Sequence, residues 1–326
     1  MSDGDEIAEV AVFAPARLHF GFLDLQGGLG RRFGSLGLVI DGFGTRLRIA
    51  RADAPAATGP QAERALQCLE RAAFAFGLPA NARIEIEQVI PDHVGLGSGT
   101  QLGLAVGAAL TRLHGRQTAT RDIAGAVGRG ARSGIGIGAF DLGGFLVDGG
   151  LGPATEVAPI VSRLDFPPEW RMLLILDPKR QGLSGAIEKA AFSALPAFPE
   201  SLSGRLCRIL MMQLLPGIAE RQFKAVADAL GEIQDRTGDY FSPLQNGRYT
   251  SPAVSEVLGW LHESGITGIG QSSWGPTGFA LFESADQAAS VSAVLADRFG
   301  ARHELEFLVV AGRNSGAEIA EKPALS

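Results

Sequence analysis

A glycine- and serine-rich loop that leads directly into a helix constrains this chain more than any other feature. The segment reads PDHVGLGSGTQLGLAVGAAL and spans residues 91–110. Its glycines let the backbone turn tightly and approach a ligand closely, and its serine and threonine add hydroxyl groups. The helix that follows has unpaired amides and a positive dipole at its first turn. The segment therefore predicts an anion site, with phosphate as the commonest ligand and simple helix capping as the alternative.

Length and charge limit the class of protein. The 326 residues can bury a large core, either as one domain or as two lobes. A net charge of −6 argues against a general binder of nucleic acid or of membrane surfaces. Cys68 and Cys207 lack metal-binding spacing and are typical of a reducing compartment. Because the N-terminus has no apolar signal region and no apolar run reaches spanning length, we expect a cytoplasmic protein.

The spacing of apolar residues predicts strands and helices that do not alternate regularly. We expect strands at residues 8–25, 35–41, 45–50, 82–90, 145–150, 172–177, 278–284 and 303–310, with a turn at Asp41-Gly42. We expect helices after the loop and at 61–76, 120–128, 184–194, 201–215, 219–237, 252–263 and 286–299. This mixture is typical of an α+β fold with two lobes, placed at residues 1–160 and 161–326. The glycine-rich stretch 129–150 is not expected to form an ordinary helix, and the tail from Gly312 is expected to be frayed.

Charged residues near the N-terminus lie among glycines and apolar residues. They are Arg17, Asp24, Arg31 and Arg32. A guanidinium pairs well with phosphate or carboxylate, and an aspartate can hold Mg²⁺ or stabilise developing positive charge. The alternative is a surface Asp–Arg pair beside a glycine turn. His19 lies on the same predicted strand, and a core position suits it better than a catalytic role.

Polar groups also lie in the glycine-rich stretch. Arg132 and Ser133 are adjacent, and three glycines lie between them and Asp141, which indicates a backbone close to a ligand or to another backbone. Asp148 precedes two glycines and is read as a turn residue.

Two further segments carry candidate side chains. Lys179 and Arg180 follow a predicted central strand, where they can meet a phosphate or lie in a solvated loop. Ser272 and Ser273 lie on a late glycine turn, and Trp274 beside them can stack on a ring or pack a hairpin.

The order of these motifs resembles that of the GHMP kinases. The matching segments are PARLHFGFLD, GLGSGTQ, SGIGIGAFDLGG and the late glycine turn. The resemblance implies a two-lobed α+β fold, with an N-terminal lobe like domain 2 of ribosomal protein S5 and a ferredoxin-like C-terminal lobe. It also implies that the glycine-serine loop binds nucleotide phosphates.

The third motif departs from the kinase pattern. Many of these kinases carry Ser-Gly-Val-Asp, in which the aspartate is the base that acts on the substrate hydroxyl. The matching residues here are Ser133, Gly134, Ile135 and Gly136, so glycine stands at the position of the base. A hydroxyl nucleophile would lack a positioned proton acceptor, which weakens the kinase interpretation without removing it.

A non-kinase branch matches these details better. RSGIGIGAFDLGGFLVDGG, ARLHFGFLDL and GLSG at residues 182–185 resemble the β-ribofuranosylaminobenzene 5′-phosphate synthases. That family joins phosphoribosyl pyrophosphate to 4-aminobenzoate or 4-hydroxybenzoate in tetrahydromethanopterin biosynthesis, and it releases CO₂ and pyrophosphate. Because the group that leaves the ring carbon is CO₂ and not a proton, no hydroxyl needs a base. The resemblance further implies Mg²⁺, a homodimer, and no nucleic-acid or membrane partner.

The candidate roles follow from motif and resemblance together. Expected phosphate-binding residues are Gly95, Leu96, Gly97, Ser98, Gly99 and Thr100. Expected catalytic residues are Asp24, Arg31 and Arg17, with Asp24 also the metal ligand. Expected substrate-binding residues are Arg32, Arg132, Ser133, Asp141, Lys179, Arg180, Ser272 and Ser273. An ATP-dependent kinase of small molecules and an inert binding protein on the same fold are the competing hypotheses.

Overall fold

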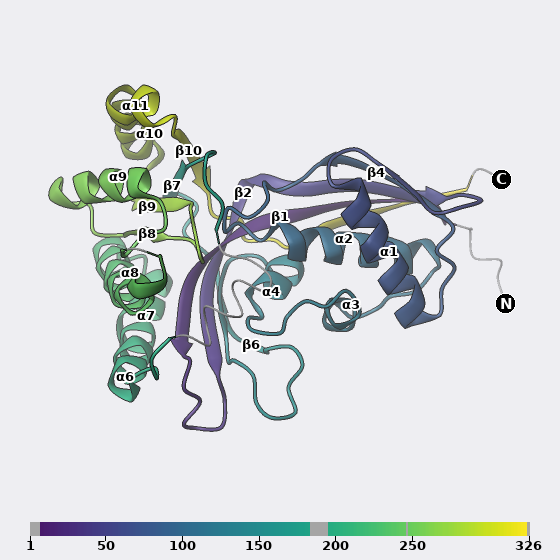
Figure 1. The fold of residues 1–326 in the computed structure, drawn as a ribbon, viewed down its shortest axis with the longest axis horizontal. Helices are drawn as coiled ribbons and strands as arrows, with labels where there is room; N and C mark the ends of the chain where they lie inside the picture. Colours follow the sequence, from purple (N-terminus) through teal and green to yellow (C-terminus); the bar gives the residue numbers. More distant parts are fainter. Residues whose placement is uncertain (1–6, 183–194, 246, 325–326) are drawn as a thin grey trace.

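The computed structural model describes residues 7–182, 195–245 and 247–324, arranged as two lobes (Figure 1). The predicted α+β fold with two lobes is confirmed. The expected helix at 184–194 and most of the GLSG segment lie outside the described residues. The division at residues 160 and 161 stays a prediction.

The first sheet is built on two long antiparallel strands, β1 (Ile7–Asp24) and β2 (Phe33–Arg51). β4 (Ala82–Gln88) and the short β3 (Ala56–Thr58) extend the sheet beyond one half of β2. β5 (Phe145–Asp148) and β6 (Ile160–Leu164) extend it beyond the other half. The long pair runs from one lobe to the other, so residues on β1 reach the region between them (Figure 1).

Four helices pack on one face of this sheet: α1 (Ala62–Phe76), α2 (Ser98–Leu113), α3 (Thr120–Ala126) and α4 (Ile135–Asp141). Alternate residues of the strands, such as Val12 and Ile49, are buried against them. α2 is buried on nearly all sides because its small residues let α1 and α3 approach closely: a Cβ on Gly107 would lie 2.3 Å from Ile123.

The second sheet has the order β10-β7-β9-β8 and is antiparallel. Its strands are β7 (Arg171–Leu176), β8 (Ile269–Gln271), β9 (Gly278–Phe282) and β10 (Glu306–Ala311). After Arg171, β7 is entirely apolar, as is typical of a strand whose two faces are both covered. Leu173 packs toward α9 (Pro252–Glu263) and α10 (Ala285–Leu295), whereas Leu174 packs toward α8 (Phe223–Gln245) and toward β1.

Short helical segments complete the second lobe. α6 (Glu200–Ile209), η1 (Leu210–Leu214) and α7 (Leu215–Ala219) form one continuous stretch before α8. η2 (Ala296–Gly300) and α11 (Ala301–His303) follow α10. The helix predicted at 219–237 corresponds to α8. It begins four residues later, at Phe223, and ends eight residues later, at Gln245. Among the described residues, no helix is both long and apolar enough to cross a bilayer.

Two expectations about local structure were wrong. The turn predicted at Asp41-Gly42 is a wide bulge in β2, because both halves of β2 pair with the same strand, β1. The glycine-rich stretch contains α4, which lies against β6: a Cβ on Gly138 would come within 2.7 Å of Ile160. Its glycines therefore serve close packing and do not break the helix.

The C-terminal tail was also predicted wrongly. Residues Glu318–Pro323 form β11, which pairs antiparallel with Ile7–Phe13 at the edge of the first sheet. Ile319 packs against the buried cluster beneath that sheet. The second half of the chain thus contributes the edge strand of the first sheet.

Truncation after Ala317 tests the contribution of this strand. We expect a fall in melting temperature of about 5 °C, because the edge of β1 loses its hydrogen-bonded partner and the apolar contact of Ile319. Thermal unfolding followed by circular dichroism measures it. Removal of residues 325–326 alone is the control, and an equal Tm for both truncations would contradict the structural role of β11.

Candidate active site

The glycine-serine loop lies at the first turn of α2, where the two lobes meet. Gly97 has φ of +92° and caps the helix, and its carbonyl accepts the amides of Thr100 and Gln101. Gly95 has φ of +86°, and a Cβ there would lie 2.3 Å from the carbonyl oxygen of Ser272. Glycine is therefore required at position 95 by conformation and by space.

Ser272 connects the loop to the first strand. Its hydroxyl accepts the amide of His19 at 3.0 Å and donates to the carbonyl of Gly95 at 2.7 Å. The amide of Ser273 donates to the carbonyl of His19 at 2.9 Å. The fully buried Ser272 thus positions the loop, whereas the exposed Ser273 lines the pocket described next.

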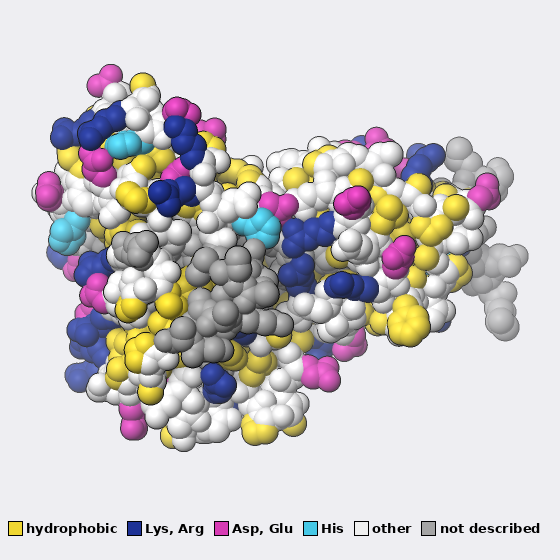
Figure 2. Space-filling model, viewed as in Figure 1, with side chains coloured by type: hydrophobic (Ala, Val, Ile, Leu, Met, Phe, Trp, Pro, Cys, Tyr) yellow, Lys and Arg dark blue, Asp and Glu magenta, His cyan; other side chains and the backbone are white. Residues whose placement is uncertain are grey.

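A pocket of about 280 Å³ opens beside the loop, and we call it the arginine pocket. Its cationic residues are Arg17, Arg129 and Arg132, and its hydroxyl groups come from Thr100, Ser133 and Ser273. Among the described residues that line it there is no carboxylate. Figure 2 shows Lys and Arg side chains gathered between the lobes on the side of α1 and α2. Three arginines beside a helix N-terminus, in a pocket whose described lining has no carboxylate, favour an anionic ligand.

Arg17 is held against the loop. Its Nη1 donates to the carbonyl of Gly95 at 2.6 Å, and its guanidinium carbon lies 3.4 Å from the position of a Cβ on Gly97. Its Nε is buried and has no partner among the described residues. Burial lowers the pKa of Arg17 to about 10, so the side chain stays protonated at neutral pH. A buried cationic donor without a partner is suited to a ligand oxygen.

Arg64 and Arg129 lie directly over the first turn of α2. A Cβ on Gly99 would meet Arg64 Nη2 at 2.1 Å and Arg129 Nη2 at 3.0 Å. Arg64 also pairs with Asp92 at 3.0 Å, and Asp92 accepts a hydrogen bond from Ser98 at 2.8 Å. Burial lowers the pKa of Arg129, and Arg64 nearby lowers it further. A side chain at position 99 would displace these guanidinium groups from their places over the helix.

The buried carboxylate of Asp148 fixes the backbone and the serine at the start of the third motif, residues 133–144. This carboxylate, 1% exposed, accepts the amides of Gly134 at 2.9 Å and Gly150 at 2.9 Å and the hydroxyl of Ser133 at 3.1 Å. It also accepts the hydroxyl and the amide of Ser35. Burial raises its pKa, and these hydrogen bonds lower it. Asp148 was predicted to be a turn residue, because nothing in the local pattern reveals partners 14 to 113 residues away.

Gly136, at the position of the kinase base, lines the arginine pocket. A Cβ there would lie 2.9 Å from Cγ2 of Thr100, so a larger residue would displace that side chain.

The expected catalytic residues other than Arg17 lie elsewhere. Asp24 Oδ1 accepts the amides of Gln26 at 2.7 Å and Gly27 at 3.0 Å at the turn between β1 and β2. Arg31 donates to the carbonyl oxygens of Gly149 at 2.8 Å and Gly150 at 2.7 Å. Neither lines the arginine pocket, so their catalytic roles stay predictions.

A second pocket adjoins the first. Arg132 lines both, and Arg32, Phe33, Phe198 and Tyr240 line only the second, whose volume is about 570 Å³. Arg32 Nε donates to the carbonyl of Leu25 at 3.3 Å. The predicted substrate-binding Arg32 is thus adjacent to the arginine pocket and not within it.

Three expected substrate-binding residues are remote from the arginine pocket. Asp141 accepts a hydrogen bond from Thr120 at the end of α4. Lys179 pairs with Glu304 at 2.7 Å, and Arg180 lies beside a different cleft near the start of α9. None of the three lines the arginine pocket.

His19 is buried at the edge of the arginine pocket. It is 5% exposed, and its Nδ1 accepts the amide of Gly21 at 3.2 Å. Burial, together with the positive charges of Arg17 and Arg132, lowers its pKa to about 3. The ring is therefore neutral at physiological pH and carries its proton on Nε2.

Comparisons with known proteins place this site in a family. The GHMP kinase N-terminal domain matches residues 61–147, and the GHMP kinase C-terminal domain matches residues 214–301. A β-ribofuranosylphenol 5′-phosphate synthase from Archaeoglobus fulgidus is 31% identical over 94% of this chain and 97% of its own. The chain belongs to this synthase family. A second member, from Methanothermobacter thermautotrophicus, is 27% identical over 95% of this chain and 98% of its own.

Solved structures show how widely the synthase fold is shared. Mevalonate-3-kinase from Thermoplasma acidophilum aligns with a TM-score of 0.69 at 11% identity, covering 98% of this chain and all of its own. A homoserine kinase from Cytophaga hutchinsonii aligns with a TM-score of 0.65 at 18% identity, covering 98% and 99%. At this identity the likeness concerns the fold alone. This member of the synthase family is therefore an enzyme on a GHMP-kinase scaffold.

Asp148→Asn tests the buried carboxylate. We expect the free energy of unfolding to fall by about 3 kcal/mol, because an amide presents an N–H to donors that need an acceptor. Urea denaturation measures it. Asp165→Asn is the matched control, since that side chain is 72% exposed. Equal losses in both variants would show that Asp148 does not organise the motif.

The neutral state of His19 predicts a pH dependence of stability. Because its folded pKa of about 3 lies below the unfolded 6.5, the unfolded chain binds more protons between these values. The contribution of the neutral His19 to the free energy of unfolding is fully present above pH 6.5 and is lost as the pH falls toward 3. The side-chain oxygen of Asn in His19→Asn can still accept the Gly21 amide. Between pH 7 and pH 5, we expect the free energy of unfolding of this variant to fall by about 2 kcal/mol less than that of wild type. Urea titrations at both pH values measure this, and identical losses would contradict a buried neutral His19.

Proposed function

We propose that this synthase condenses phosphoribosyl pyrophosphate with 4-hydroxybenzoate or 4-aminobenzoate to give a C-riboside 5′-phosphate in tetrahydromethanopterin biosynthesis. CO₂ and pyrophosphate leave. The observation that carries the proposal is the arginine pocket itself, which holds three arginines and a glycine at the kinase base position, with no carboxylate among its described lining residues. The names of the relatives, which are ribofuranosylphenol phosphate synthases, support it.

The proposed reaction needs no proton acceptor. The ring carbon that bears the carboxylate supplies an electron pair to C1 of the ribose, and the bond from C1 to the pyrophosphate oxygen breaks. Pyrophosphate leaves with that bond's electron pair. The bond between the ring and the carboxylate then breaks, its electrons restore the aromatic ring, and CO₂ departs. An aspartate at position 136 would therefore have no proton to remove.

The chain's own groups are suited to the departing pyrophosphate. The first turn of α2, the buried Nε of Arg17 and the guanidinium of Arg129 all lie beside the loop: the two arginines approach the positions of a Cβ on Gly97 and on Gly99. Donors that are fixed before the reaction stabilise charge that develops on a leaving group. The same donors bind the ground-state diphosphate more weakly, because its charge is less concentrated on the leaving oxygen.

Mg²⁺ enters this proposal with the substrate. The described residues contain no group of three or more His, Cys, Asp or Glu side chains that could hold a metal ion. Mg²⁺ is commonly held by one or two carboxylates plus substrate phosphates. Because the described lining of the arginine pocket has no carboxylate, we propose that Mg²⁺ arrives bound to the diphosphate oxygens. Asp24, which caps a turn, remains a proposed ligand only.

The remaining expectations are proposals as well. Arg31 holds the Gly149-Gly150 turn beside Asp148, so we propose that it supports the third motif and does not bind the benzoate. A homodimer rests on the family resemblance, and a cytoplasmic location rests on the sequence patterns described above.

Release of labelled CO₂ tests the proposed reaction. The protein is incubated with phosphoribosyl pyrophosphate, Mg²⁺ and carboxyl-labelled 4-hydroxybenzoate or 4-aminobenzoate. We expect labelled CO₂ and one pyrophosphate per turnover. ATP consumption with an added alcohol and no decarboxylation would favour the kinase, and binding without any reaction would favour an inert binding protein.

Arg129→Gln tests the assignment of the pocket. Loss of a charged hydrogen-bond donor is expected to lower kcat/KM for phosphoribosyl pyrophosphate by about 10- to 100-fold. Arg208→Gln is the matched control, because Arg208 is exposed on α6. Equal kinetics for the two variants would remove Arg129 from the diphosphate site.

A further inference from the structure

A third, narrower cavity lies next to the arginine pocket, between β1, α8 and the turn that joins β8 to β9. The two cavities share His19, Phe22, Ser273 and Trp274. We call the narrower one the aromatic cavity, because rings make up most of its apolar lining. Phe241 packs edge-on against Trp274, with ring centroids 4.9 Å apart, and Phe22 packs against His19 at 5.0 Å. A ring that enters it would meet aromatic edges and faces.

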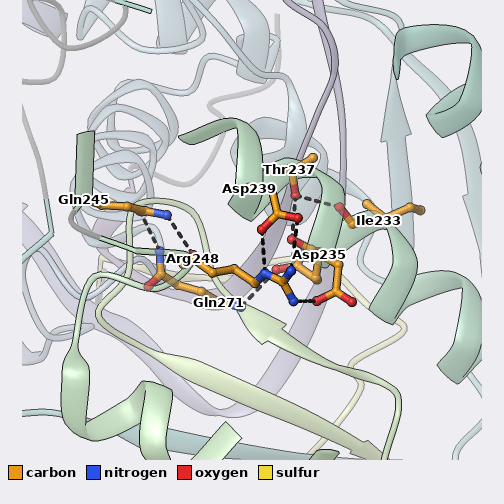
Figure 3. Close-up of polar contacts among 8 residues, drawn as sticks. Ile233, Asp235, Thr237, Asp239, Gln245, Arg248 and Gln271 are labelled. Atoms are coloured by element: carbon orange, nitrogen blue, oxygen red, sulfur yellow. Dashed lines mark hydrogen bonds and ion pairs between the residues drawn. The ribbon is translucent and has the colours of Figure 1, made fainter. Parts of the chain in front are cut away.

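The aromatic cavity ends in neutral amides. Gln245 and Gln271 line it, and Figure 3 shows them side by side with Arg248. Gln271 Nε2 reaches its two acceptors at only 3.4 Å and 3.3 Å, the long end of the range for N–H···O hydrogen bonds. This amide can therefore make a better bond to a ligand than the bonds it makes within the protein.

Arg248 does not make this end cationic. Its guanidinium pairs with Asp235 and with Asp239, the latter at 2.8 Å, as Figure 3 shows. Because two carboxylates surround one guanidinium, the net charge of this group is not positive. It therefore does not attract the carboxylate of a ligand. The cationic end of the combined space is the arginine pocket, on the other side of His19.

We propose that the aromatic cavity binds the ring of the acceptor acid, with the para hydroxyl or amino group against Gln245 and Gln271. The carbon that bears the carboxylate then faces His19 and the arginine pocket. This inference rests on the proposed function and adds to it the place and the direction of the acceptor. The opposite direction would put a carboxylate among neutral amides and beside Asp239, which is unfavourable.

The proposed direction suits the chemistry. A para hydroxyl or amino group that donates a hydrogen bond to an amide oxygen releases electron density into the ring, where the carbon opposite becomes nucleophilic. The neutral His19 beside that carbon does not hold the carboxylate as an ion pair, so the carboxylate remains free to leave as CO₂.

The cavity is narrow: its volume, measured as for the two pockets above, is about 40 Å³. Gly21 and Gly238 line it, and a Cβ on Gly238 would lie 2.5 Å from Arg248. A fused two-ring acid is therefore expected to bind poorly.

The test compares two acids in two proteins. Dissociation constants of 4-hydroxybenzoate and of benzoate, which lacks the para group, are measured by calorimetry with pyrophosphate and ribose 5-phosphate present, so that nothing can react. For Gln245→Met we expect 4-hydroxybenzoate to bind about tenfold more weakly and benzoate to bind unchanged. Gln213→Met is the matched control, because Gln213 is half-buried on η1 and bonds to Ala225 away from the cavity.

A second variant addresses the ring contact. Phe241→Leu is expected to raise the dissociation constants of both acids several-fold, since the apolar contact with the ring does not depend on the para group. Circular dichroism confirms that each variant is folded. If Gln245→Met weakens benzoate as much as 4-hydroxybenzoate, or if neither variant changes either acid, the assignment of the cavity is overturned.

The outcomes separate this inference from the proposed function. Labelled CO₂ release by wild type, together with unchanged binding in both variants, would keep the reaction and remove the aromatic cavity. The expected binding pattern without CO₂ release would keep a benzoate-binding cavity and remove the reaction.

Discussion

The site depends on one set of hydrogen bonds between segments far apart in the sequence. The carbonyl of Gly95 accepts both the hydroxyl of Ser272 and the guanidinium of Arg17. The same hydroxyl accepts the amide of His19, so one buried serine joins β1, the glycine-serine loop and the second lobe. Because both partners of each bond are held by packed elements, the loop has one position, and the α2 amides point at one place.

Electrostatics then decides what this place can bind. Arginines gather over the first turn of α2, and the carboxylates nearby are occupied: Asp92 with Arg64 and Ser98, and Asp148 with backbone amides and hydroxyls beneath the third motif. A cationic pocket whose described lining has no carboxylate suits a diphosphate leaving group. The base of a kinase would place negative charge there and would weaken that stabilisation. The glycine at position 136 and the arginines are thus two parts of one arrangement.

Sequence patterns predicted most of the architecture but few of the long-range contacts. The two-lobed α+β fold, the apolar β7 and the loop before α2 follow from local periodicity and glycine spacing, and the structure confirms them. β11 was missed because its polar residues have no pattern until β1 provides an edge to pair with. α4 was missed because its glycines pack against Thr100 and Ile160, which no local propensity reveals.

The sequence by itself determined which chemistry the chain can carry: a glycine-serine loop before a helix, arginines near it, and no aspartate at the kinase base position. Only the tertiary structure decided which of these residues meet. It brought Arg17, Arg129 and Arg132 to the loop, left Lys179, Arg180 and Asp141 elsewhere, and gave Asp148 a central place. The physical reason is that residue type fixes charge and hydrogen-bonding capacity, whereas the packing of two sheets and their helices fixes distance and burial.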